Sequence, residues 1–160
     1  MERNDDARKA GSYRDLLVWQ KGIALVRQIY QLTRTFPPEE KFGLASQMQR
    51  AAVSVPSNIA EGQARHTTGE FVQSISYAEG SLAELDTQLV VAVELGYCSE
   101  PKAEPTLERV LELRRMLNSL RRKLITWHCL LRAADGLRHF FDHFEQFLAL
   151  LRGKLREIVP

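Results

Sequence analysis

Apolar side chains recur at alternating steps of three and four residues along most of this sequence. That spacing places them on one side of an α-helix, whereas a half-buried strand would alternate polar and apolar residues at every second position. No sustained alternation of period two occurs, so we expect an all-α protein. Proline- and glycine-containing segments interrupt the pattern and divide it into five predicted helices, at about residues 15–35, 39–64, 67–96, 105–133 and 137–158.

The first predicted helix carries two neighbouring apolar stripes, and a face this wide indicates contacts with two other helices. The stripes are Leu16, Trp19, Ile23, Val26 and Tyr30, and beside them Leu25, Ile29, Leu32 and Phe36. Short connections between sequential helices favour an up-down antiparallel four-helix bundle with a C-terminal fifth helix. We therefore expect residues 1–12 to be a disordered arm, residues 13–125 the bundle, and residues 126–160 the end of the fourth helix plus the extra helix.

Several local signals predict where the helices begin, end and approach one another. The acidic residues 39–40 suit the first turn of the second helix, near its positive dipole end. Thr67 and Glu70 have the spacing of a capping box at the start of the third helix. Gly96 and the segment 97–105 form the next break, and the small residues at 80–81 predict close approach of another helix.

Pro56 lies in the middle of the second predicted helix, where a proline costs about 3 kcal/mol. The carbonyl of Ala52 loses its hydrogen-bond donor there and needs another partner. Polar side chains flank the proline: Ser54, Ser57 and Asn58. Two interpretations stay open. The proline either bends the helix to follow the bundle, or it presents Asn58, Glu61 and Arg65 in a polar site.

Composition narrows the class of protein. The chain has 160 residues, 44% of them hydrophobic and 26% charged, which is typical of one globular domain. The N-terminal segment lacks the apolar core of a signal peptide, and no run approaches the roughly 18 apolar residues that cross a bilayer. Two cysteines, Cys98 and Cys129, do not make a disulfide framework. We expect a cytoplasmic protein without a membrane partner.

Charge is unevenly distributed although the net charge is only +2. The third helix has five acidic residues and no Lys or Arg, whereas residues 105–133 have seven basic residues and two acidic ones. Arg114 and Arg121 are seven residues apart, as are Arg115 and Arg122, so they form two adjacent rows on one helix face. The candidate nucleic-acid-binding residues are Arg114, Arg115, Arg121, Arg122 and Lys123.

Three interpretations of this basic face compete. It forms exposed ion pairs with the acidic third helix, which contribute about 0 to 1 kcal/mol each. Alternatively, it contacts the acidic face of a neighbouring subunit, and such a head-to-tail contact closes into a ring where the rotation allows. As a third interpretation, it binds phosphates, with an affinity that falls steeply with salt. The last two are compatible, and bound RNA would be recognised by backbone and shape.

Most of the chain, about residues 13–125, resembles a known protein family. The resemblance includes the strings "LASQMQRAAVSVPSNIAEG" at 44–62 and "GSLAELDTQLVVAVELGY" at 80–97. These strings resemble the bacterial four-helix-bundle family named for proteins encoded in intervening sequences of 23S ribosomal RNA genes, which is related to the accessory variability proteins of diversity-generating retroelements. The motif residues are Gln47, Arg50, Ser54, Pro56, Asn58, Ile59, Glu61 and Gly62.

The resemblance implies an up-down protomer that assembles into a homopentameric ring, without known catalysis. It also implies binding of RNA, DNA or a partner protein through basic surface; in the retroelement relatives the partners are a reverse transcriptase and its RNA template. We therefore expect a non-enzymatic, ring-forming accessory protein that binds structured RNA or other nucleic acid. The alternative is a protein-interaction adaptor, for example a partner of a reverse transcriptase, with no direct nucleic-acid contact. Residues 126–160 have no counterpart in the family pattern.

The sequence motifs give little support for an enzymatic site or a cofactor site. His139 and His143 are one helical turn apart, which suits half of a metal site, but no further ligands follow at a recognisable spacing. His128 and Cys129 point in different directions because they are adjacent on a helix. No glycine-rich phosphate loop, paired-carboxylate signal or Ser-His-Asp elbow occurs. We expect no cofactor and no enzyme, and a metal-dependent enzyme that uses His139 and His143 is the remaining hypothesis.

Overall fold

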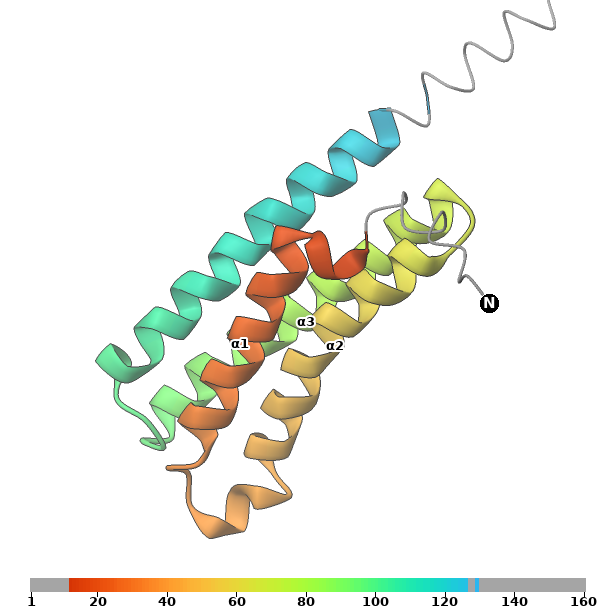
Figure 1. Ribbon diagram of the computed structural model, residues 1–160. Coiled ribbons are helices and arrows are strands. Elements are labelled where there is room, and N and C mark those ends of the chain that lie inside the picture. Colours follow the sequence, from red (N-terminus) through yellow and green to blue (C-terminus); the bar gives the residue numbers. More distant parts are fainter. Residues whose placement is uncertain (1–11, 127–128, 130–160) are drawn as a thin grey trace, which may run out of the picture. The chain divides into compact units, whose positions relative to one another are not determined.

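The protein is an antiparallel bundle of four helices in the part of the chain that the computed structural model describes, residues 12–126 and 129. The helices are α1 (Leu17–Thr33), α2 (Leu44–Ala64), α3 (Thr68–Glu94) and a fourth helix, residues 100–126. Successive helices run in opposite directions and lie side by side (Figure 1). No strand occurs among the described residues, so the all-α prediction is confirmed. The predicted arm at residues 1–11 and the predicted fifth helix lie outside the described residues.

The chain divides into two compact units, Met1–Arg122 and Lys123–Pro160. The first unit contains α1, α2, α3 and the fourth helix as far as residue 122. Its core consists of the apolar residues that the three-four spacing predicts. The fully buried ones include Leu25, Ile29, Met48, Val55, Ile59, Ile75, Leu82, Leu85, Leu89, Val110, Leu113 and Leu117. In the second unit, residues 123–126 are helical.

Helix α1 contacts two neighbours, as its wide apolar face predicts. Gln49 of α2 donates a hydrogen bond of 2.9 Å to the hydroxyl of Thr33, and Lys21 is bonded to Glu112 of the fourth helix. One apolar stripe of α1 is buried between these helices, but the other lies at the edge of the bundle. There Ile23 and Tyr30 stay partly exposed. The stripe that contains Ile23 and Tyr30 is thus only half covered by this bundle.

Two helix starts differ from the prediction. Residues 38–41 form a 3₁₀ turn instead of the beginning of α2, and the carboxylate of Glu40 accepts a bond of 2.7 Å from the N–H of Leu44. Glu40 therefore caps α2 from outside, where the first N–H groups lack helical partners. The fourth helix begins at residue 100, not at Pro105. Pro101 is tolerated in the first turn because its missing N–H would have no partner there.

Pro56 lies inside a continuous α2 and packs against α1. A Cβ built on Gly22 of α1 would lie 3.4 Å from the Cβ of Pro56, so the two helices meet closely at this pair. The hydroxyl of Ser57 donates to the carbonyl of Val53, at 2.9 Å, and does not replace the lost donor at Ala52. The buried proline ring therefore has a packing role in the contact between α1 and α2.

The two small-residue positions in α2 and α3 differ sharply in their surroundings. At Gly62, an added Cβ would lie 2.6 Å from the ring of Phe71 and 2.7 Å from the Cβ of Ser74. At Gly80, nothing lies within 4 Å of such an atom, so the expected close approach there is wrong: Gly80 faces solvent. Its neighbour Ser81 does contact α2, through a hydrogen bond of 3.0 Å to the hydroxyl of Ser54.

The capping box at the start of α3 is confirmed and yields a pH-dependent prediction. The Thr67 hydroxyl accepts from the Glu70 N–H and donates to the Glu70 carboxylate, which lowers the pKa of Glu70 below its ordinary value of 4.5. Replacing Thr67 with alanine should lower the free energy of unfolding by about 1 kcal/mol at neutral pH. A lowered pKa means that the ionised Glu70 carboxylate stabilises the fold. The stabilisation by this carboxylate is therefore lost as the pH falls through the folded-state pKa of Glu70.

Urea unfolding of the wild type and of Thr67→Ala at neutral pH and below pH 4.5 measures this effect. The difference between the two proteins should narrow in acid. A Glu70→Gln variant should lose stability at neutral pH and little in acid. A difference that stays constant across the pH range would contradict the role assigned to the Glu70 carboxylate.

Candidate nucleic-acid interface

One of the two predicted arginine rows on the fourth helix faces the acidic helix α3. The Arg114 guanidinium lies 3.4 Å from the carboxylate of Asp86, and Arg121 lies 3.4 Å from that of Glu79. Arg121 also donates to the side chain of Asn118, at 2.9 Å. Both ion pairs are partly exposed, so each contributes little to stability. For this row the structure matches the interpretation of ion pairing across the bundle.

The other row points outward. Arg115 is exposed and makes no ion pair or hydrogen bond with any residue that the structure describes. Arg122 is also exposed, and Lys123, likewise exposed, belongs to the second compact unit. The five predicted residues therefore do not form one equivalent set. Their assignment to nucleic acid stays a prediction, and Arg115 is the clearest unneutralised cation among them.

A small charge cluster joins α1 to the fourth helix. Lys21 and Arg109 both bind the carboxylate of Glu112, the latter at 2.8 Å. The Lys21 ammonium is the main reason why the pKa of Glu112 is lowered, and Arg109 acts in the same direction. Two cations thus share one carboxylate, and this seam keeps a local positive charge even though its members are paired.

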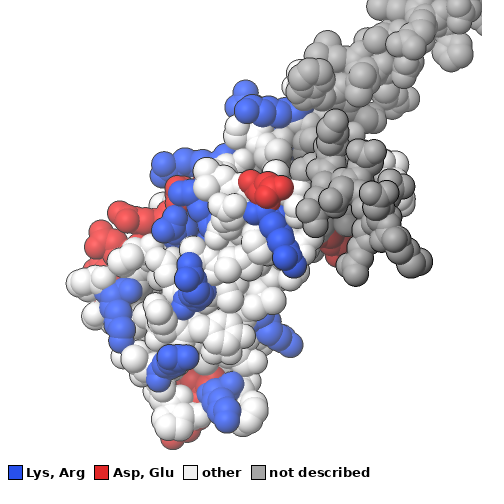
Figure 2. All heavy atoms as spheres, in the orientation of Figure 1, with Lys and Arg blue, Asp and Glu red and all other residues white. Residues whose placement is uncertain are grey.

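The longest stretch of positive charge without carboxylates lies on α1 and α2. Helix α1 contains no Asp or Glu, and the only acidic residue of α2, Glu61, forms an ion pair with Arg65. Arg27 and Arg34 are exposed and have no partner among the described residues. Figure 2 shows separate Lys and Arg side chains scattered over one face of the molecule, with fewer carboxylates among them. This surface was not predicted as a site, although its signal is in the sequence: from residue 16 to 60 the only acidic residues are at 39 and 40.

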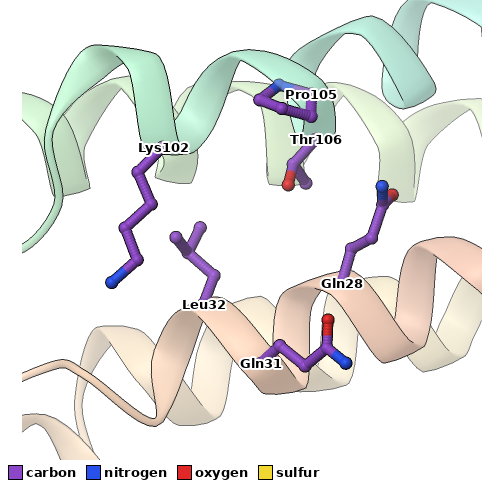
Figure 3. Close-up of a pocket in the computed structure, with 6 residues that line it drawn as sticks. All are labelled: Gln28, Gln31, Leu32, Lys102, Pro105 and Thr106. Carbon is purple, nitrogen blue, oxygen red and sulfur yellow. The ribbon is translucent and has the colours of Figure 1, made fainter.

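Two hollows border α1. The first is a groove of about 380 Å³ between α1 and α2, where Tyr30 is 42% exposed. Its lining residues are Tyr30, Ser46, Gln49, Arg50, Val53 and Ser54. The second, of about 260 Å³, lies between α1 and the fourth helix, where Gln28 and Thr106 point toward each other from facing helices (Figure 3). Neither hollow is lined by His, Cys, Asp or Glu among the described residues.

The family-motif residues mostly hold α2 to its neighbours. Asn58 donates to the Ser54 hydroxyl at 3.0 Å, and Ser81 of α3 donates to the same oxygen. The structure does not gather Asn58, Glu61 and Arg65 into one polar site, because Glu61 binds Arg65 and Asn58 binds Ser54. The remaining motif residues lie as follows: Gln47 accepts from Arg50 at 3.1 Å, Pro56 packs on Gly22, and Gly62 meets Phe71.

The described residues contain no group of three or more His, Cys, Asp and Glu side chains that could hold a metal ion. His139 and His143 lie outside the described residues. Within the described part of the chain, no helix has the length and apolar character needed to cross a membrane. Cys98 is buried, and burial raises the pKa of its thiol, which makes this cysteine a poor nucleophile.

Comparisons with known proteins agree with this architecture. A solved structure of a protein with unknown function from the S23 ribosomal protein family of Bacteroides thetaiotaomicron is similar, with a TM-score of 0.62 and 19% sequence identity. The alignment covers 66% of this chain and 98% of that one, and at this identity it shows the fold alone. A comparison with the curated proteins finds no match. The family model described as 23S rRNA-intervening sequence protein matches residues 14–119, and the chain therefore belongs to that family.

Proposed function

We propose that this protein is a non-enzymatic accessory protein that binds structured RNA or other nucleic acid through its basic surface, as a homo-oligomeric ring. The observation that carries the proposal is the set of exposed arginines that no carboxylate neutralises in the described part of the chain. Arg27 and Arg34 beside α1 and Arg115 on the fourth helix have no ion pair or hydrogen bond with any described residue, and Arg50 of α2 is bonded only to the neutral side chain of Gln47. The name of the family, which refers to 23S rRNA, is consistent with such a partner.

Unpaired arginines are better phosphate ligands than paired ones. A guanidinium that binds a phosphate releases the counterions condensed on the nucleic acid, and this release drives association. Arg114 must first give up Asp86, and Arg121 must give up Glu79, so part of the gain is lost for these two. Arg27, Arg34 and Arg115 have no such competitor among the described residues. We therefore place the main phosphate contacts on the unpaired set.

A matched pair of variants tests this ranking. In the test variant, Arg27, Arg34 and Arg115 are changed to Gln; in the control, Arg114 and Arg121 are changed to Gln. Fluorescence anisotropy with a labelled hairpin RNA should show a loss of at least about tenfold in affinity for the test variant, because three guanidinium groups that contact phosphates are removed, and the remaining affinity should depend less on salt. The control should lose distinctly less per residue replaced. Equal losses per residue, or no binding by the wild type, would contradict the proposal.

The ring rests on the separation of charge and on exposed apolar groups. The carboxylates of α3 and the basic surface of α1 and α2 lie on different helices, and a head-to-tail contact between two copies would bring them together. Leu17 and Val90 leave more than half of their surface exposed on the single protomer. We propose a homopentamer, as the resemblance implies. Light scattering on the full chain should give about five times the protomer mass of 18.3 kDa, and a monomer would contradict the ring.

A protein-interaction adaptor is the second candidate, because apolar side chains on α3 and directly after it are exposed to solvent. Tyr77 and Val90 of α3, and Leu95 directly after it, are each more than half exposed. A partner protein, such as a reverse transcriptase, could bind these side chains without any nucleic acid. Stoichiometric co-purification of one protein, together with an absorbance ratio that excludes nucleic acid, would favour the adaptor over the proposal above.

A further inference from the structure

We infer that the groove between α1 and α2 is a binding site for single-stranded RNA, in which an unstacked base lies on Tyr30 and neighbouring arginines hold the backbone. This inference rests on the proposed function and deepens it, because it assigns the site and the class of nucleic acid.

Tyr30 supplies the surface on which a base can stack. Tyr30 is 42% exposed, and its hydroxyl has no hydrogen-bond partner among the described residues. Val53 of α2 lines the same groove and is 40% exposed, so an apolar side chain lies in the groove together with Tyr30. An exposed aromatic ring beside basic residues is the platform on which proteins stack the bases of single strands.

Three arginines belong to the two helices that form this groove or follow them directly, and one of them, Arg50, lines it. Arg27 precedes Tyr30 by three residues and Arg34 follows it by four, so both lie beside the ring on the same side of α1. Arg50 lines the groove from α2 and is bonded only to the neutral side chain of Gln47 among the described residues. The seven residue steps from Arg27 to Arg34 span about 10 Å along the helix axis. That is the length of roughly three stacked nucleotides at about 3.4 Å each, so one short strand reaches both arginines.

The groove fits a single strand better than a duplex. Bases in a duplex are stacked on their neighbours and do not reach an aromatic side chain, whereas loops and ends expose them. Polar groups in the same groove suit the ribose. Gln49 uses its amide N–H in the bond to Thr33, which leaves its oxygen to accept from a 2′-hydroxyl, and Ser46 lines the same wall. The 2′-hydroxyl is the group by which a protein distinguishes RNA from DNA.

The second hollow, between α1 and the fourth helix, has fewer of the groups that would bind a single strand. Its cation, Lys102, donates to the Thr35 hydroxyl at 3.0 Å, and no aromatic residue lines it. The groove between α1 and α2 is therefore the one that is lined by an exposed aromatic residue, by an arginine without a carboxylate partner and by groups that can bind a hydroxyl.

The test uses the full chain and one labelled 12-nucleotide RNA of mixed sequence, offered as a single strand, as a duplex and as the equivalent single-stranded DNA. Tyr30→Ser should weaken binding of the single-stranded RNA by about tenfold and leave duplex binding unchanged, whereas Tyr30→Phe should bind like the wild type. The matched control is Tyr77→Ser on α3; Tyr77 is 58% exposed, and this variant should bind normally. Changing Arg27, Arg34 and Arg50 to Gln should weaken binding of every probe.

The outcomes separate this inference from the proposed function. If the wild type binds no nucleic acid, the proposed function fails and the inference fails with it. If RNA binds but Tyr30→Ser matches the wild type, or Tyr77→Ser shows an equal loss, the groove is not the site and only the inference is overturned. Equal affinity for single-stranded DNA overturns the RNA assignment. Because Tyr30→Phe keeps the ring, its wild-type affinity shows that any loss in Tyr30→Ser reflects stacking; circular dichroism checks that both variants fold.

Discussion

Replacing Leu85 with alanine should lower the free energy of unfolding by about 2 to 5 kcal/mol, the largest single-residue effect that we expect in this bundle. Leu85 is fully buried in the apolar stripe of α3. The substitution removes buried apolar surface and leaves a cavity, because the surrounding helices relax only partly. Urea or thermal unfolding followed by circular dichroism measures the loss.

Leu95→Ala is the matched control for this prediction. Leu95 comes directly after α3 and is 57% exposed, so its replacement should change the stability by no more than about 0.5 kcal/mol. If the two variants lose similar amounts of stability, the packing of α3 in the bundle is not as described.

Gly62→Ala should destabilise the protein by about 1 to 3 kcal/mol, although alanine is intrinsically the better helix former. The added Cβ would lie 2.6 Å from the Phe71 ring and 2.7 Å from the Cβ of Ser74, distances that force one of the helices to move. Overpacking of a close helix contact outweighs the gain in helix propensity of about 1 kcal/mol.

The same substitution at Gly80 should act in the opposite direction. Gly80 lies within α3, and an added Cβ would meet nothing within 4 Å. Gly80→Ala should therefore stabilise the protein by up to about 1 kcal/mol through helix propensity alone. Chemical denaturation of the two variants in parallel tests the pair. Stabilisation by both would show that α2 and α3 do not approach closely at Gly62.

The fold follows from the sequence because its main signal is periodic. The stripe that runs through Leu82, Leu85 and Leu89 is buried as the spacing predicts. A local signal predicted the start of α3 correctly, because the capping box needs only the two residues Thr67 and Glu70. Local signals failed at the start of the fourth helix, because Pro101 reads as a breaker but is harmless in a first turn.

The basic site was harder to predict, because a row of charges on one helix does not reveal what faces it. Arg114 and Arg115 are adjacent in the sequence, yet one meets Asp86 and the other meets solvent. Whether Arg114 or Arg115 meets a carboxylate depends on the rotation of the fourth helix against α3, and that rotation is fixed by core packing across all four helices. The absence of carboxylates from α1 is visible in the sequence, but only the fold shows that α2 continues the same surface.

The salt dependence of RNA affinity tests the central claim most directly, namely that arginines without carboxylate partners are available to phosphates. The full-length wild type is titrated with a single-stranded RNA at several salt concentrations between about 50 and about 200 mM. Three phosphate contacts predict that log K falls linearly with log salt concentration, with a slope of about −2. An affinity that does not change over this range, or no measurable binding at the lowest salt, would contradict the account.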